Sequence, residues 1–309
     1  MLRYILFRCL QAVPVLLIVI SFTFILVRAA PGGPFDSEKV VPPQILEILN
    51  ERYHLDDPLH TQLSDYILNL IKGDLGPSFR FPGRSVNELI LNGLPYTLEL
   101  GLYAILFALF TGVLAGLLAA SRPNSIQDYI PMSLAMTGIC LPAFVLGPIL
   151  LLIFSIWLEW FPVSGWGQFS NDKILPTITL GSAYSAYIAR LTRGGMLEIL
   201  SQDFIRTARA KGLSEATIVL KHGIKGGLIP VISFLGPAMA GLLSGSFVVE
   251  SIFQIPGLGR FYIQAAFNRD YTMIMGTTIF FAFLIIFFNL LSDIVAAWLN
   301  PRIRYGSSN

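Results

Sequence analysis

Long apolar stretches alternate with polar connections along the chain. An apolar run of about 20 residues is long enough to cross a bilayer as a helix, and the sequence has six stretches that match or approach this length. They cover residues 9–27, 96–120, 130–158, 174–189, 228–249 and 273–299. This pattern predicts an all-α polytopic membrane protein with six transmembrane helices.

The composition agrees with this prediction. Of the 309 residues, 54% are hydrophobic and 13% are charged, whereas a soluble domain is about one-quarter charged. The net charge of +2 argues against a nucleic-acid partner. Cys9 and Cys140 fall in different apolar stretches, so we expect no disulfide, and with three histidines in the chain we expect no metal site.

The basic residues predict the orientation of the spans. Short loops that are rich in Lys and Arg stay in the cytoplasm. In the six-span arrangement, the segments assigned to the inside hold twelve of the 21 Lys and Arg residues. The two short outside loops hold only Lys173, Arg260 and Arg269. Both termini are therefore expected in the cytoplasm.

Four parts follow from this arrangement. They are a cytoplasmic N-terminus with the first span (1–29), an extracytoplasmic helical region (30–95), a five-helix core with a cytoplasmic loop (96–300, loop 190–225) and a cytoplasmic tail (301–309). A cleaved signal peptide is the alternative for the first span. We favour a retained anchor, because the apolar stretch is longer than a usual signal core.

The region 30–95 is too polar to span a membrane, and its turn and capping signals predict short helices. Asp57–Pro58 is typical of a helix start, and Ser85 with Glu88 form a capping box before another helix. Such a region can be a docking platform for a binding protein or a cap packed on the spans. The sequence leaves both interpretations open.

The polar loop 190–225 separates the fourth and fifth spans and predicts a helix of its own. It holds seven Lys and Arg residues. Asp203 can cap a short helix over Phe204–Lys211, and Gly212 can end that helix in the left-handed conformation. We expect a helix held out on a cytoplasmic loop to contact a protein outside the membrane.

This loop also resembles a known family. The run FIRTARAKGL, from Phe204 to Leu213, followed by Leu228-Ile-Pro230, resembles the EAA loop of ABC-importer permeases. Arg206 and Thr207 replace the Glu and the first Ala of the general EAA pattern, as in the peptide branch. Similarity to the B-type subunit of oligopeptide and dipeptide permeases extends over essentially the whole chain, and its motifs include the MLRYILFRCL start, GDLGPSF, NRDY and PRIRY.

The resemblance implies a type I ABC-importer permease fold, in which the EAA loop forms a coupling helix that docks on an ATPase subunit. In this chain the coupling helix would comprise Phe204, Ile205, Arg206, Thr207, Ala208, Arg209, Ala210, Lys211 and Gly212. We expect the apolar residues Phe204, Ile205 and Ala208 to insert into a cleft on the ATPase, and the basic residues to fix the orientation.

The same resemblance implies the partners and the location. The partners would be a homologous C-type permease, two ABC ATPase subunits that bind ATP and Mg, an extracytoplasmic peptide-binding protein and a peptide substrate. The complex would lie in the inner membrane of a bacterial cell. This chain has no GxxxxGK[ST], HExxH, paired CxxC or GxSxG motif, so we expect it to be non-catalytic and to bind no cofactor.

The stretch 174–189 is a poor lipid-facing helix, because it is rich in small and polar residues. Tyr184, Ser185 and Tyr187 are therefore candidate residues of a transport pathway. Close packing of helices through small residues is the alternative explanation.

Asp293 in the last span is a candidate buried charge. An acid at this depth needs a partner and can relay protons in a proton-coupled carrier. We favour a structural pair with an arginine such as Arg190 or Arg193.

Two functions are compatible with these features. One is a transport subunit that depends on separate ATPases, and the other is a stand-alone ion- or proton-coupled carrier. The single candidate acid, Asp293, and the helix on the cytoplasmic loop favour the first, because a lone carrier has no evident use for that helix.

Overall fold

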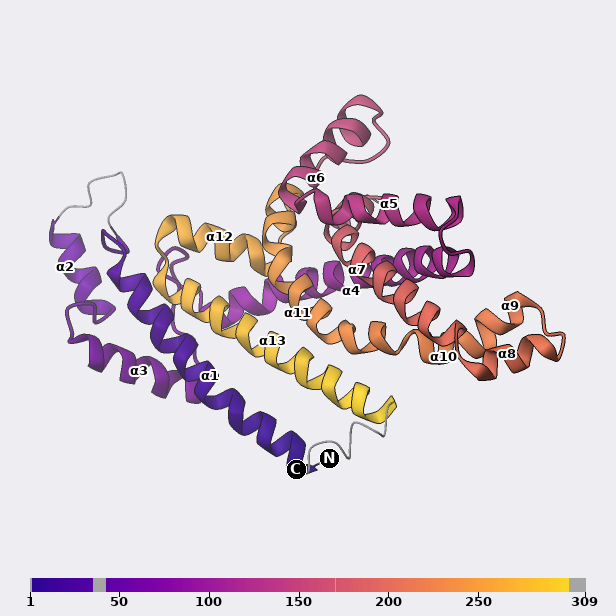
Figure 1. The fold of residues 1–309 in the computed structure, drawn as a ribbon. Helices are drawn as coiled ribbons and strands as arrows, with labels where there is room; N and C mark the ends of the chain where they lie inside the picture. The colour runs from indigo at the N-terminus through magenta and orange to yellow at the C-terminus, as the bar shows by residue number, and fades with distance from the viewer. Residues whose placement is uncertain (1, 36–42, 170, 300–309) are drawn as a thin grey trace. The chain divides into compact units, whose positions relative to one another are not determined.

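The computed structural model describes residues 2–35, 43–169 and 171–299. In these ranges every regular element is a helix (Figure 1). The chain divides into two compact units. The first unit comprises residues 1–97 and 256–284, and the second comprises residues 98–255 and 285–309. The predicted cytoplasmic tail lies outside the described residues.

The first unit combines long apolar helices with short ones. Its elements are α1 (Leu2–Ala29), α2 (Pro43–Arg52), α3 (Leu59–Ile71), the first part of α4 (Val86–Ser121), α12 (Leu258–Asn268) and the first part of α13 (Tyr271–Leu299). One face of α3 packs on a cluster of α1 and α13 side chains: Leu63, Tyr66, Ile67 and Leu70 against Ile20, Phe24, Met275 and Ile279. The helix predicted after Asp57–Pro58 is confirmed, and it covers the long helices as a packed cap.

A buried carboxylate organises the connection between α12 and α13. Asp270 is almost fully buried and accepts a hydrogen bond of 2.5 Å from the hydroxyl of Ser78. It also accepts the backbone N–H groups of Phe79, Arg80 and Met273, each at 3.2 Å. The loop between α3 and α4 is thereby held to the start of α13.

The second unit is built around α7 (Ile174–Leu200), against which α5, α6, α10 and α11 all pack. The other elements are the rest of α4, α5 (Ile126–Cys140), α6 (Ala143–Leu150), the π-helix η1 (Leu151–Trp157), α8 (Asp203–Ala210), α9 (Glu215–Thr217), the π-helix η2 (Ile218–Gly223), α10 (Ile224–Gly227), α11 (Ile229–Ile252) and the end of α13.

Two glycines let α4 approach α7 closely. A side chain at Gly112 would place its Cβ atom 2.6 Å from the carbonyl oxygen of Ser185, and one at Gly116 would lie 2.6 Å from the carbonyl oxygen of Ala189. Glycines at this GxxxG spacing permit backbone contact between helices in a membrane. The small residues of α7 thus serve packing at these positions.

The described helices supply five candidate spans by length and composition. Three are single helices, Leu6–Ala29, Val86–Ser121 and Tyr271–Val295, and the other two require that each of two bent helix pairs form one span. The pair Ile126–Cys140 and Ala143–Trp157 bends by 107°, and the pair Glu215–Gly227 and Ile229–Leu243 bends by 52°. The first bend occurs at Leu141 and Pro142, because proline cannot continue the hydrogen-bond ladder.

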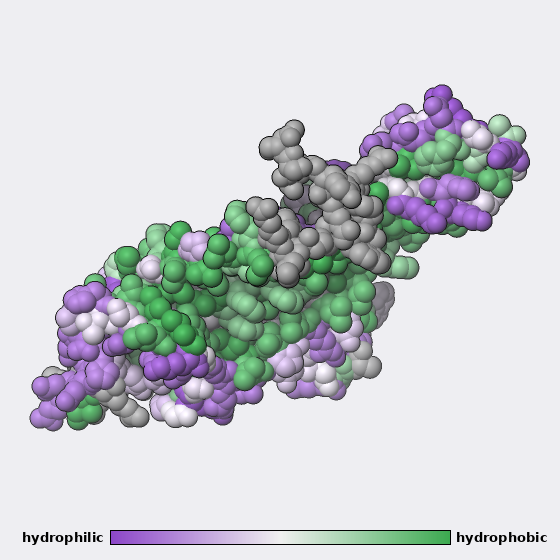
Figure 2. Space-filling model, turned by 90° about the horizontal axis from the view of Figure 1, so that it is seen from below, coloured by the Kyte–Doolittle hydropathy of each residue, from purple (hydrophilic) through white to green (hydrophobic). Residues whose placement is uncertain are grey.

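α7 is the remaining predicted span. It is 27 residues long, and its small and polar residues distinguish it from the other five. Many large apolar side chains on the other spans are exposed; on α1, Leu10 is 69% and Ile18 is 67% exposed. Figure 2 shows such apolar surface spread over the helices, with hydrophilic side chains gathered in separate patches. A bilayer accounts for this much exposed apolar surface.

Candidate functional site: the loop between α7 and α11

The predicted helix in the polar loop is present as α8, which runs from Asp203 to Ala210. Gly212 follows it with φ of +79°, as its predicted left-handed conformation requires. The expected N-cap is wrong by one position: Gln202 precedes the helix in an extended conformation and makes no side-chain cap. Asp203 lies in the first turn and pairs with Arg206 at 3.3 Å.

The inner face of α8 packs on its own loop. Ile205 is fully buried and Ala208 is 7% exposed, and both join a cluster with Ile218 of η2 and Leu200 of α7. The expectation that these two residues insert into a cleft on a partner is therefore wrong. Phe204, which is 50% exposed, is the large apolar residue of α8 that remains accessible.

The outer face of α8 is polar and basic. Arg206, Thr207, Ala210 and Lys211 are exposed. Arg209 donates to both carboxylate oxygens of Glu215 on α9, at 2.7 and 3.1 Å, and this bond raises the pKa of the Arg209 guanidinium. The pair connects α8 to α9 and leaves an exposed surface that combines Phe204 with positive charge.

We call residues 201–227 the α8 module, and it is joined to α7 by close backbone contact. A side chain at Gly226 would place its Cβ atom 2.6 Å from Cδ1 of Ile199. Gly195 of α7 faces the carbonyl oxygen of Gly227 with no room for a side chain. Because glycine lies on at least one side of each contact, the module and the end of α7 approach closely and form one packed body.

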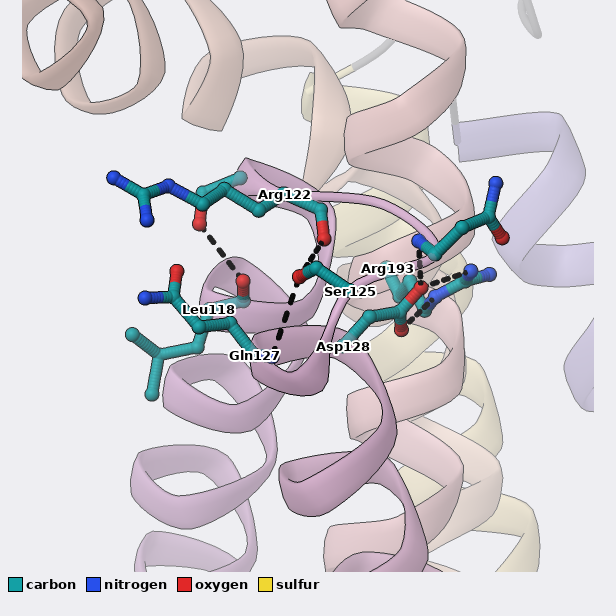
Figure 3. A network of polar contacts seen from close by, with 8 residues as sticks. Leu118, Arg122, Ser125, Gln127, Asp128 and Arg193 are labelled. Carbon is teal, nitrogen blue, oxygen red and sulfur yellow. Dashed lines mark hydrogen bonds and ion pairs between the residues drawn. The ribbon is translucent and has the colours of Figure 1, made fainter.

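A second contact ties α7 to α5. Arg193 donates two hydrogen bonds to Asp128, both 2.7 Å long (Figure 3). Asp128 is 3% exposed, and its Oδ2 atom also accepts the backbone N–H of Asn124 at 2.9 Å. A two-pronged pair of guanidinium and carboxylate fixes the distance and the orientation of both side chains.

The sequence favours an arginine such as Arg190 or Arg193 as the partner of Asp293. Arg193, one of the two arginines expected to pair with it, is engaged by Asp128. The other, Arg190, lies with its Nη2 atom 3.1 Å from Sδ of Met136. Asp293 lies half-buried on α13.

The sequence around Asp128 contains a local signal for its position. Ser125 and Asp128 have the spacing of a capping box. Ser125 does cap α5, because its hydroxyl accepts the backbone N–H of Gln127. The side chain of Asp128 reaches back to the N–H of Asn124, so the capping pattern positions the carboxylate that Arg193 binds.

The three candidate pathway residues face different neighbours. The hydroxyl of Tyr184 lies against Gly241 of α11, and the ring of Tyr187 lies 5.8 Å from that of Phe234. Ser185 faces the other way and shares a hydrogen bond of 2.7 Å with Thr111 of α4. The structure therefore does not bring the three side chains to one surface within this chain.

Ser185 lines a cavity of about 370 Å³ between α4, α5, α6 and α7. Most of its lining is apolar, with the hydroxyls of Thr111, Thr137, Ser182 and Ser185 as the polar contribution.

Another buried polar contact was missed in the segment before α7. Trp166 is 8% exposed, and its indole N–H donates to Oε2 of Glu99 at 2.7 Å. Lys173 donates to the other oxygen of Glu99 at 2.6 Å, and this bond raises the pKa of the Lys173 ammonium. The contact holds the segment between η1 and α7 against α4.

Comparison with known protein families identifies the family of this chain. The model of the family "binding-protein-dependent transport system inner membrane component" matches residues 112–305, and the model of its N-terminal part matches residues 1–101. The chain belongs to this family. It is a transport permease of the inner membrane that crosses the bilayer several times.

Curated permeases are similar over nearly their whole length. The oligopeptide transport system permease protein OppB of Haemophilus influenzae is 48% identical, and that of Escherichia coli K12 is 45% identical; each alignment covers 99% of this chain and 100% of the relative. The dipeptide transport system permease protein DppB of Bacillus subtilis is 41% identical over 98% of both chains. The resemblance to oligopeptide and dipeptide permeases is confirmed.

Solved structures confirm the permease fold. An inward-facing structure of the MetNI methionine ABC transporter matches with a TM-score of 0.56 at 17% identity, over 69% of this chain and 96% of that chain. An amino acid ABC transporter with histidines matches with a TM-score of 0.50 at 20% identity, over 70% and 94%. The fold is the type I ABC-transporter permease fold expected from the sequence.

Proposed function

We propose that this permease is the B-type transmembrane subunit of an ATP-driven bacterial importer of oligopeptides or dipeptides. The observation that carries the proposal is the identity of 41–48% over nearly full length with permeases named for these substrates. The α8 module supports it, because a basic helix with one exposed aromatic side chain is suited to docking on another protein.

The partners would be those of an ABC importer. A homologous C-type permease would complete the translocation pathway, two ABC ATPases would bind ATP and Mg and hydrolyse ATP, and an extracytoplasmic binding protein would deliver the peptide. Both termini of this non-catalytic chain would lie in the cytoplasm. The short outside loops with few basic residues favour this orientation.

The coupling helix would be α8 with Gly212. Residues on its outer face, Phe204, Arg206, Thr207, Ala210 and Lys211, would meet the ATPase, while Ile205 and Ala208 hold the helix to its own loop. Arg209 and Glu215 would fix the edge of this surface. Closure of the ATPases would move the α8 module, and the permeases would alternate between outward-open and inward-open states that the partners bind with different affinity.

The test is reconstitution of the permease with its C-type partner and both ATPases in proteoliposomes. With binding protein outside and ATP inside, labelled tri- to pentapeptides or dipeptides should accumulate. Uptake should depend on ATP and on the binding protein. Accumulation by the permease alone under an ion gradient would instead support the stand-alone carrier.

A further inference from the structure

The α8 module is mechanically continuous with α7. Gly226 and Gly195 allow direct contact between the module and the last turns of α7, and Ile205 and Ala208 bury their side chains between them. A movement of α8 would therefore carry the end of α7 with it rather than be absorbed within the loop.

Arg193 lies two residues before Gly195, within this packed part of α7. Its guanidinium binds both oxygens of Asp128 in the first turns of α5. Asp128 is 3% exposed, and a buried carboxylate that loses its cation is strongly disfavoured. The pair is therefore expected to stay closed while α7 moves, so that the start of α5 follows α7.

α5 is well placed to use such a movement. It ends at Leu141 and Pro142, where the chain turns by 107° into α6 and η1. Beyond Asp128, a close approach to α7 occurs at Gly138, where a Cβ atom would lie 3.1 Å from that of Ser182. The cavity of about 370 Å³ that α5 shares with α4, α6 and α7 leaves space beside α5 for such a movement.

We propose that Asp128 and Arg193 are positioning residues that transmit the movement of the α8 module to α5 and its bend. The pair would set how much substrate is moved for each ATP that the partner subunits hydrolyse. This inference rests on the proposed function, since it requires ATPases that act on α8.

The experiment compares variants in the complete complex, reconstituted with binding protein. Asp128→Asn and Arg193→Gln remove one charge each, and Arg193→Lys keeps the charge but loses the two-pronged geometry. The matched control is Arg122→Gln, a nearby exposed cation whose side chain points away from the pair (Figure 3). Uptake and ATP hydrolysis are both measured in each preparation, and their ratio is the readout.

We expect Asp128→Asn and Arg193→Gln to lower the ratio of uptake to hydrolysis by about tenfold. Arg193→Lys should fall between them and the wild type, and Arg122→Gln should match the wild type. A reduced number of well-folded complexes lowers both rates in proportion and leaves the ratio unchanged, so the ratio separates transmission from a structural role.

Rescue supplies a second readout. In a chain with Cys9 and Cys140 replaced by Ser, Asp128→Cys with Arg193→Cys should uncouple the complex, and a short bifunctional thiol cross-linker should restore the ratio. An unchanged ratio in both charge variants would overturn the proposal, as would failure of every variant to assemble or failure of the cross-link to restore coupling. Absence of uptake in the wild-type complex would overturn the proposed function instead.

Discussion

At the scale of single residues, Gly212 and Asp270 fix local structure outside the apolar core. Gly212 acts through its backbone conformation and Asp270 through its hydrogen bonds. Gly212 takes a left-handed conformation, and nothing lies within 4 Å of the place where its Cβ would be. Its requirement for glycine is therefore conformational and not steric. At Asp270 in the first unit the side chain itself is required, because its carboxylate accepts hydrogen bonds from several surrounding donors.

Gly212→Val should weaken docking of the ATPases. A β-branched side chain disfavours the left-handed conformation by about 1–2 kcal/mol, so the end of α8 should be displaced. Gly212→Asn should be milder, because Asn tolerates this conformation. Gly194→Ala is the matched control, since Gly194 also has open space but no positive φ. The measurement is the amount of ATPase that co-purifies with the permease, and equal amounts in Gly212→Val and wild type would contradict the prediction.

Asp270→Ala should destabilise the first unit. The change leaves the hydroxyl of Ser78 and three backbone N–H groups without their acceptor, at a cost of about 2–3 kcal/mol. Asp74→Ala removes only the exposed acceptor for the N–H of Gly76 and should cost less. Thermal unfolding in detergent measures both variants, and a smaller loss of stability for Asp270→Ala than for Asp74→Ala would exclude this role.

At the scale of elements, α8 divides its apolar residues between two faces. Ile205 and Ala208 pack on Ile218 and Leu200, whereas Phe204 is half exposed. Phe204 and Ile205 are both close to Ala208 on the helix surface, because residues three or four apart are neighbours. Packing against Ile218 and Leu200 therefore decides which of them is buried. The helix therefore anchors itself with one face and presents the other.

Phe204→Ala and Ile205→Ala should have different effects. Phe204→Ala should reduce co-purification of the ATPases while leaving the thermal stability of the permease alone unchanged. Ile205→Ala should lower stability, since truncating a fully buried aliphatic side chain costs about 2–5 kcal/mol. Loss of stability in Phe204→Ala with an intact Ile205→Ala would reverse the assignment of the two faces.

At the scale of the whole molecule, the distribution of charge along the sequence predicts which loops lie on which side of the membrane. The region that contains α3 is assigned to the outside, and the turn between α4 and α5 is assigned to the inside. The two positions Ser64 and Arg122 are both exposed and report on these assignments.

Single cysteines at these positions should label from opposite sides. In a background with Cys9 and Cys140 replaced by Ser, Ser64→Cys should react with an impermeant thiol reagent in intact spheroplasts. Arg122→Cys should react only in inverted vesicles. Reaction of both positions in spheroplasts would contradict the six-span arrangement.

The sequence by itself determined the fold class, because long apolar helices are the way such a chain satisfies its backbone in lipid. It also located α8 and the left-handed Gly212, since caps, helical spacing and glycine act over a few neighbouring residues. The family followed from motifs that cover nearly the whole chain.

Only the tertiary structure decided which side chains meet. Periodicity places Ile205 and Phe204 on a short helix but does not say which face its own loop covers. Asp128 and Arg193 are 65 residues apart, and pairing over that distance depends on how α5 packs against α7. For the same reason the sequence groups Tyr184, Ser185 and Tyr187, although both tyrosines face α11 and Ser185 faces α4. Contacts of this kind arise from packing between elements, which local sequence patterns do not encode.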